Sequence, residues 1–196
     1  PYTFIPQQKL NRLSSKNHQG VICMLSPIRY ASLDNLIAKA YDDGREPFLL
    51  VLDRITDVRN FGAIARTAEC AGLDGIVIAD KGNAPVTADA IKTSAGALSH
   101  LPVCRASDLR KTIQQLRENG IRVVACTEKA SKLIYEVDLR SPVALVMGSE
   151  EDGISPDILR VADDLAKIPM KGRVGSLNVS VAAGVAIYET IRQKLL

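Results

Sequence analysis

Three short segments of the sequence carry polar side chains of the types that bind ligands or take part in catalysis. They are RITDVRNFGAIARTAECAG at residues 54–72, SEEDGIS at 149–155 and MKGRVGSLNVS at 170–180. Each follows a short apolar run that has the character of a strand. In sheets of parallel strands, ligands bind beyond the carboxyl ends of the strands. We therefore expect the three segments to meet at one edge of a sheet.

The first segment presents an arginine on a predicted helix. Asn60 is expected to be the N-cap of this helix, and Ile64 begins its buried stripe. At 100° per residue Arg66 lies about 200° from Ile64, and Gly62 shares its face and leaves the backbone open beneath it. This predicts an approach surface for a phosphate or a ribose. An ordinary surface arginine explains the same pattern.

The second segment has three consecutive acids, Glu150, Glu151 and Asp152, between Gly148 and Gly153. Carboxylates at the end of a strand can bind Mg²⁺ or pair with a cationic ligand. A charged turn bounded by glycines is the alternative.

The third segment combines glycines with Ser176, Asn178 and Ser180 ahead of an apolar helix. A glycine-containing loop that leads into a helix can offer backbone N–H groups to a ligand. Two small residues, Ala183 and Gly184, allow another element to approach the backbone closely, and tight helix packing explains them equally well. Packing does not explain the polar cluster at the start of the helix.

The elements that must position these segments are visible as alternating patterns. Four short apolar runs predict strands at residues 48–53, 75–80, 121–127 and 142–148, and a shorter strand is predicted at 165–169. Helical stripes of apolar residues lie between them, over 64–71 and 109–116. Strands that are apolar throughout are covered on both faces, so the chain is predicted to be an α/β protein with a mostly parallel sheet flanked by helices.

Helix boundaries follow from the capping residues. Ser107 is the expected N-cap of the helix over 109–116, and Gly120 is its stop. Ser155 followed by Pro156 predicts a short helix to about residue 161. The last helix should run from about Asn178 to the end of the chain. It is apolar nearly all round as far as residue 187, so its first half is predicted to be buried.

The composition excludes several classes of protein. Of the 196 residues, 46% are hydrophobic and 24% are charged, which excludes a disordered or collagen-like chain. No apolar run approaches the roughly 18 residues that a membrane span needs. Neither the dinucleotide-binding pattern G-x-G-x-x-G nor the phosphate-binding pattern G-x-x-x-x-G-K-[ST] occurs.

Metal and redox sites are not expected. The four cysteines, Cys23, Cys70, Cys104 and Cys126, are widely spaced in apolar contexts, so they are predicted to be reduced core residues of a cytoplasmic protein. There are only two histidines. The net charge of +3 permits an anionic partner without requiring one. Basic residues precede the first acid, Asp34, and indicate either a phosphate contact or a solvated linker.

Together, N-x-G-A-I-x-R at residues 60–66, VMGSEEDGIS at 146–155 and IPMKGRVGSLNVSVAAGVAIYE at 168–189 resemble the three motifs of the SpoU branch of the SPOUT RNA methyltransferases. The resemblance extends from about residue 18 to the end of the chain. The segment LNRLSSKNHQGVI resembles the junction before the catalytic domain in the bacterial 23S rRNA guanosine 2′-O-methyltransferase group. Residues 1–20 are therefore expected to be a linker or the tail of an upstream L30e-like RNA-binding domain, and residues 21–196 the catalytic domain.

The resemblance implies a trefoil knot at the C-terminal end of the fold, a homodimer and a bound S-adenosylmethionine. The residues it assigns to cofactor binding are Met147, Gly148, Ile168, Met170 and Leu177. Those it assigns to the reaction centre are Asn60, Arg66, Glu150, Ser176, Asn178 and Ser180, with Asn60 supporting Arg66. It assigns no metal.

The function implied is methyl transfer from S-adenosylmethionine to a ribose 2′-OH in RNA, with a guanosine of 23S rRNA as the expected target. A tRNA ribose is the alternative target, and a non-catalytic RNA-binding assembly factor is the alternative from another class. A guanidinium is ordinarily a donor and not a base. Arg66 is therefore expected to fix a phosphate and stabilise a developing alkoxide, while the proton leaves through another group.

Overall fold

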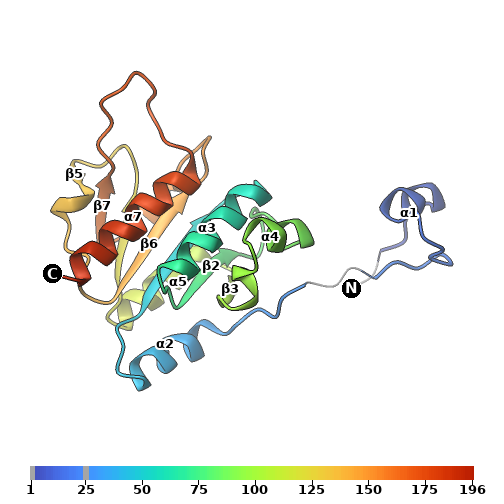
Figure 1. Cartoon of the computed structure of the whole chain (residues 1–196), viewed down its shortest axis with the longest axis horizontal. Coiled ribbons are helices and arrows are strands. Elements are labelled where there is room, and N and C mark those ends of the chain that lie inside the picture. Colours follow the sequence, from blue (N-terminus) through green and yellow to red (C-terminus); the bar gives the residue numbers. More distant parts are fainter. Residues whose placement is uncertain (1–2, 24–26) are drawn as a thin grey trace.

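The computed structural model describes residues 3–23 and 27–196, and its centre is a parallel sheet of seven strands (Figure 1). The strands are β1 (Phe48–Asp53), β2 (Gly75–Ala79), β3 (Val103–Ala106), β4 (Arg122–Cys126), β5 (Lys132–Leu133), β6 (Val143–Gly148) and β7 (Asp164–Lys167). Their order across the sheet is β3-β2-β1-β6-β4-β7-β5, and every pairing is parallel. The predicted α/β class is confirmed.

The central strands are those that the sequence predicted. All six residues of β1 and of β6 are buried, as expected for strands covered on both faces. The strands β2, β4 and β7 also lie where they were predicted. The sequence did not predict β3 and β5, because β3 has an exposed arginine in only four residues and β5 has only two residues.

Helices cover both faces of the sheet. They are α1 (Gln7–Leu13), α2 (Leu33–Asp42), α3 (Val58–Cys70), α4 (Ala88–Thr93), α5 (Leu109–Glu118), α6 (Pro156–Leu159) and α7 (Val179–Lys194). Buried side chains of α3, α4 and α7 share one core, while those of α2, α5 and α6 share another on the opposite face of the sheet (Figure 1). The helix α1 has no buried residues and lies away from the sheet in Figure 1.

Two predicted N-caps are wrong by one to three residues. The cap of α3 is Asp57, whose carboxylate accepts hydrogen bonds from the backbone N–H groups of Arg59 and Asn60, so Asn60 lies inside the first turn. The cap of α5 is Asp108 and not Ser107. An aspartate caps as well as serine or asparagine does, so type alone did not distinguish these neighbours. Ser155 caps α6 as predicted, although its side chain makes no capping bond.

The helix α7 begins after its N-cap Asn178, as predicted, but its first half is not buried on all sides. Ala183, Ala186 and Ile187 are fully buried, whereas Val181, Val185 and Tyr188 are 40–52% exposed. The prediction of burial all round was therefore wrong. These three residues recur at helical spacing and leave one apolar stripe of α7 exposed.

All four cysteines are free, and the prediction that they are core residues holds for only part of the set. Cys104 is buried, and burial raises the pKa of its thiol to about 11. Burial also raises the pKa of Cys126 to about 12. Cys23 and Cys70 are exposed, which contradicts the prediction, because Cys70 ends α3 on its outer face. Within the described residues, no helix is long and apolar enough to span a membrane.

Candidate functional site

The carboxyl end of β6 turns back sharply on itself. Ser149 and Gly153 exchange backbone hydrogen bonds of 3.2 and 3.0 Å, which closes the turn that contains the three acids. The turn lies directly over Gly148, where a Cβ atom would stand 2.2 Å from the carbonyl carbon of Gly153. Only glycine fits at position 148, because backbone atoms occupy the place of any side chain.

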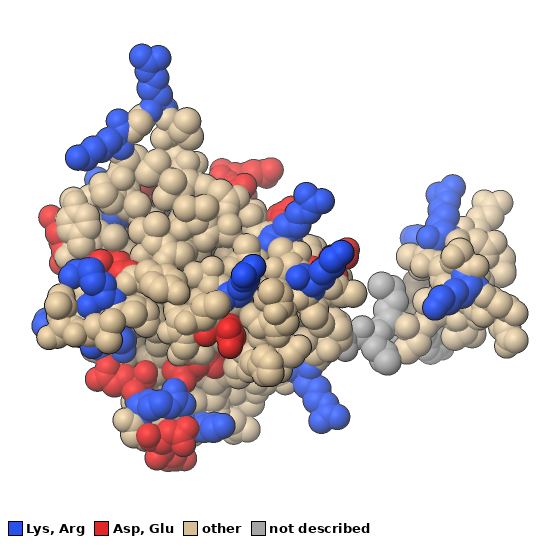
Figure 2. All heavy atoms as spheres, viewed as in Figure 1, with Lys and Arg blue, Asp and Glu red and all other residues tan. Residues whose placement is uncertain are grey.

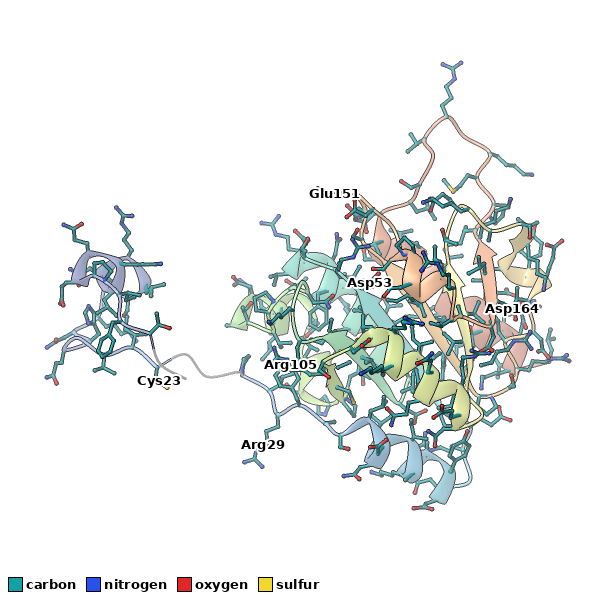
Figure 3. All side chains as sticks on the ribbon, turned by 180° about the vertical axis from the view of Figure 1, so that it is seen from behind. Cys23, Arg29, Asp53, Arg105, Glu151 and Asp164 are labelled. Carbon is teal, nitrogen blue, oxygen red and sulfur yellow. The ribbon has the colours of Figure 1, made fainter. Side chains whose placement is uncertain are left out.

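Two residues at the end of β1 hold this turn from behind. The buried carboxylate of Asp53 accepts hydrogen bonds from the backbone N–H of Ser155 at 2.7 Å and from its hydroxyl at 2.6 Å. Arg54 has the left-handed φ of 59° and donates to the carboxylate of Asp152 at 3.0 Å and to the carbonyl oxygen of Gly153 at 3.1 Å. Neither residue was predicted from the sequence, although an acid at the end of a wholly apolar strand was an available signal for a site residue. Figure 3 labels Asp53 beneath the turn and Glu151 on it.

The three predicted segments meet at Glu150. One oxygen of its carboxylate, Oε1, accepts hydrogen bonds from Asn60 Nδ2 at 3.1 Å, from Asn178 Nδ2 at 2.7 Å and from the backbone N–H of Val179 at 3.1 Å. Asn178 Nδ2 also donates to Asn60 Oδ1 at 3.0 Å. This set of Asn60, Glu150 and Asn178, here called the amide cluster, joins α3, the turn after β6 and the start of α7.

The amide cluster also positions Ser180. Asn178 Oδ1 accepts from the backbone N–H of Ser180 at 3.0 Å and from its hydroxyl at 2.5 Å. The same side chain of Asn178 thus caps α7 and binds Glu150. Within the described residues there is no group of three or more His, Cys, Asp and Glu side chains that could hold a metal ion.

A pocket of about 390 Å³ opens at this edge of the sheet, between the turn after β6 and the loop that leads into α7. All five residues predicted to bind the cofactor line it: Met147, Gly148, Ile168, Met170 and Leu177. Two residues predicted at the reaction centre, Glu150 and Ser176, line it as well. The lining therefore combines buried and half-buried apolar side chains with carboxylates.

A fourth strand end contributes to the pocket and was missed. Thr127, Glu128 and Lys129 follow β4 and line the wall beside Cys126. Their position directly after the predicted strand at 121–127 was the available signal, because β4 lies next to β6 and its end reaches the same edge.

Four residues predicted at the reaction centre do not line the pocket: Asn60, Asn178 and Ser180 belong to the amide cluster or are bound to it, whereas Arg66 has neither contact. It is exposed on α3, and no described residue forms a hydrogen bond or ion pair with its side chain. The prediction of open backbone beneath it was wrong. Gly62 is buried against α4, where a Cβ atom would lie 2.7 Å from the side chain of Thr93 and 3.0 Å from the carbonyl oxygen of Ala90. Position 62 needs glycine because α4 packs directly against its backbone.

Comparison with known proteins places this geometry in a family. The model of the SpoU rRNA Methylase family matches residues 47–188. YacO, a TrmH-family protein of Bacillus subtilis (strain 168), is 39% identical over 191 residues, which are 97% of this chain and 77% of YacO. The 23S rRNA (guanosine-2′-O-)-methyltransferase RlmB of Vibrio vulnificus (strain CMCP6) is 40% identical over 182 residues, which are 91% of this chain and 72% of RlmB.

The same likeness holds in three dimensions. The AdoMet-bound rRNA methyltransferase of Sinorhizobium meliloti aligns with a TM-score of 0.75 at 32% identity, over 84% of this chain and 61% of that one. The matched region contains all three segments that meet at Glu150. The chain belongs to the SpoU rRNA methylase family.

Proposed function

We propose that this chain transfers the methyl group of S-adenosylmethionine to a ribose 2′-OH in RNA. One observation carries the proposal: the pocket contains every residue that the family motifs assign to the cofactor, and Glu150 of the amide cluster lines the same pocket. The names of the relatives support it, since RlmB of Vibrio vulnificus is a 2′-O-methyltransferase and the Sinorhizobium meliloti structure is AdoMet-bound.

The residues of the pocket fit this cofactor. Its volume of about 390 Å³ is in the range of small-molecule sites. The apolar side chains of Met147, Ile168 and Leu177 in the lining can pack against an adenine ring. The carboxylate of Glu150 can attract a positively charged sulfur. When bound, the cofactor supplies an activated methyl group.

The chain's own residues supply orientation and charge. Met147, Gly148, Ile168, Met170 and Leu177 would hold the cofactor. Displacement in line requires that the attacking oxygen, the methyl group and the sulfur be aligned, so a rigid site is worth more than a strong base.

The amide cluster would provide that rigidity, because each of its members is held by at least one other. Ser176 and Ser180 present hydroxyl groups beside it. Arg66 would bind the phosphate next to the reacting ribose and stabilise the oxygen as negative charge develops on it. The proton of the 2′-OH leaves through another group or through water.

We propose a guanosine of 23S rRNA as the target, because two Vibrio relatives at 38–40% identity carry that activity in their names. A tRNA ribose is the second candidate, since a solved relative with TM-score 0.68 concerns 2-OH methylation of C/U34 on tRNA. A non-catalytic RNA-binding role is the third, and the hydrogen-bonded amide cluster argues against it, because a site that has lost its function has no need of such a cluster.

The proposal includes a homodimer in the cytoplasm, where RNA is made and modified. The exposed stripe of Val181, Val185 and Tyr188 on α7 is the surface that would meet its counterpart across a twofold axis. Sedimentation should then report about 42 kDa, which is twice the chain mass of 21.2 kDa. A monomer at micromolar concentration would count against the dimer. The trefoil knot around the pocket loops and the division into residues 1–20 and 21–196 belong to the same proposal.

The activity is tested by incubating the chain with tritiated S-adenosylmethionine and unmodified 23S rRNA or tRNA. Label in RNA, with one backbone position that resists alkaline cleavage, is the expected result, because alkaline cleavage requires a free 2′-OH. Cofactor binding without label in any RNA would favour the non-catalytic role.

A further inference from the structure

Lys129, which follows β4, lines the pocket, and two further cations, Lys171 and Arg173, lie on the loop between β7 and α7, between its pocket-lining residues Met170 and Gly175. We call the three cations the basic rim. Given the proposed function, we propose that the basic rim binds the phosphates of the RNA strand whose ribose enters the pocket.

The loop of the basic rim projects from the body of the protein. It extends beyond the edge of the sheet in Figure 1, and Figure 2 shows Lys and Arg side chains at its tip. All residues from 169 to 176 are exposed, and Val174 is 73% exposed. Gly172 and Gly175 have open space where a Cβ would stand, so other atoms do not crowd the backbone at these points. The tip is therefore accessible to a large partner.

The charge of this loop is uncompensated. From Ile168 to Tyr188 the sequence contains no Asp or Glu. Among residues 3–23 and 27–196, none forms an ion pair or hydrogen bond with the side chain of Lys129, Lys171 or Arg173. The cations therefore keep their full capacity for an anionic partner.

Four acids line the same pocket, and most of them are engaged. Glu150 is bound in the amide cluster, and Asp152 is paired with Arg54. Thr127 donates to Glu128 at 3.5 Å, and Glu151 is exposed on the turn. The pocket thus offers carboxylates to a cation, and the basic rim offers positive charge to an anion. A cofactor with a positive sulfur and a substrate with a phosphate backbone match these two sets of side chains.

A single RNA strand is the occupant that this arrangement favours. The rim has three cations from two loops, which is enough for contacts with two or three phosphates of one strand. Such contacts release counterions, so the binding constant falls with salt concentration in proportion to the phosphates bound. Contacts of this kind position a strand without reading its sequence.

The test measures binding of a fluorescent single-stranded RNA to the 196-residue chain, without cofactor, at several salt concentrations. Removing Lys171 and Arg173 together, by Lys171→Ala and Arg173→Ala, should weaken binding about tenfold at 0.1 M salt and lower the slope of log K against log[salt] by about 1.4. Lys129→Ala alone should lower that slope by about 0.7. In the double variant, affinity for S-adenosylmethionine should stay within about twofold, because the side chains of Lys171 and Arg173 do not line the pocket.

A matched control removes the same charge from α5, away from the basic rim. Arg110 and Lys111 are adjacent, exposed residues of α5 whose side chains no described residue binds. The double change Arg110→Ala and Lys111→Ala should leave RNA affinity and slope near those of the parent.

Equal losses in both double variants would overturn the basic rim, as would no loss in either or a parent that does not bind RNA. Loss in both would mean that net charge alone governs binding. Preferential binding of the parent to anionic lipid vesicles would also overturn it. These outcomes are separate from failure of the proposed function, which would appear as absent cofactor binding and absent methyl transfer while the rim still binds RNA.

Discussion

Two carboxylates at opposite edges of the sheet are held by different kinds of hydrogen-bond donor. Asp164, at the start of β7, accepts hydrogen bonds from Arg122 Nε at 2.9 Å and from Lys132 Nζ at 3.0 Å, so two cations compensate one acid. Glu150, beyond the end of β6, receives only amide and backbone N–H groups. Figure 3 labels Asp164 and also Glu151, the neighbour of Glu150, at these two edges.

The difference separates a structural contact from a prepared site. Ion pairs around Asp164 stabilise the edge of the sheet and leave little net charge. The amide cluster fixes the position of Glu150 and leaves its negative charge uncompensated at the wall of a pocket. Among the described residues no cationic side chain pairs with Glu150, which is why we assign the cationic ligand to this edge and not to the other.

The largest expected effect comes from breaking the turn that carries Glu150. Gly148→Ala should lower the free energy of unfolding by at least about 3 kcal/mol and abolish cofactor binding, because backbone atoms lie 2.2–2.4 Å from the added Cβ. Urea denaturation and calorimetric titration with S-adenosylmethionine measure the two effects. Gly175→Ala is the control, since Gly175 lines the same pocket with open space, and its stability should change by less than about 0.5 kcal/mol. Similar losses in both variants would contradict the close approach.

Variants of Arg66 test whether its guanidinium binds the RNA substrate and not the cofactor. Arg66→Ala should lower the rate of methyl transfer about 100-fold or more while cofactor affinity stays within a few-fold, because the contact matters only with RNA bound. Arg66→Lys should restore little, since an ammonium lacks the planar fork that spans two oxygens. Single-turnover rates and calorimetry separate the two quantities. If Arg66→Ala abolished cofactor binding and left RNA binding normal, this face of α3 would bind the cofactor and not the RNA, contrary to our assignment.

Asn178 sharpens the comparison, because it is both a helix cap and a donor to Glu150. Asn178→Ala should cost about 1 kcal/mol of unfolding free energy and weaken cofactor binding several-fold. Asp108→Ala removes the matching cap of α5, where Asp108 accepts from the backbone N–H of Lys111. That control should show a similar loss of stability with cofactor affinity unchanged. If both variants left affinity unchanged, Asn178 would be a cap and nothing more.

The smallest effect belongs to the compensated carboxylate. Burial raises the pKa of Asp164, but hydrogen bonds from Arg122 and Lys132 outweigh it and hold the pKa below its ordinary value. The stabilisation is therefore complete above the unfolded-state pKa and is lost as pH falls through the lower native value. Asp164→Asn should cost at most about 1 kcal/mol at pH 7, and the gap should close towards pH 3. Urea denaturation across that range measures it. A gap that widens on acidification would have the wrong sign.

Local patterns predicted the central strands and the three segments of the site. A continuous apolar run and the polar residues that follow it lie at neighbouring positions of the sequence, so both can be recognised there. Resemblance of the motifs to the family, and not periodicity, assigned Met147 and Leu177 to the pocket that they line. The partners of Glu150 lie 90 and 28 positions away, so no local rule could pair them. Long-range packing likewise decided the burial of Gly62 and the exposure of one stripe of α7.

The most direct test of the uncompensated charge compares S-adenosylmethionine with S-adenosylhomocysteine, its neutral-sulfur product, by calorimetry. Glu150→Gln keeps one oxygen that can accept the hydrogen bonds now made to Oε1, and it removes the charge by replacing the other oxygen with an NH₂ group. We predict that the parent binds S-adenosylmethionine, and that the variant loses about tenfold in affinity for it but less than about threefold for S-adenosylhomocysteine. A parent that binds neither ligand, or a variant that loses both equally, would contradict the assignment of this pocket to a cationic methyl donor.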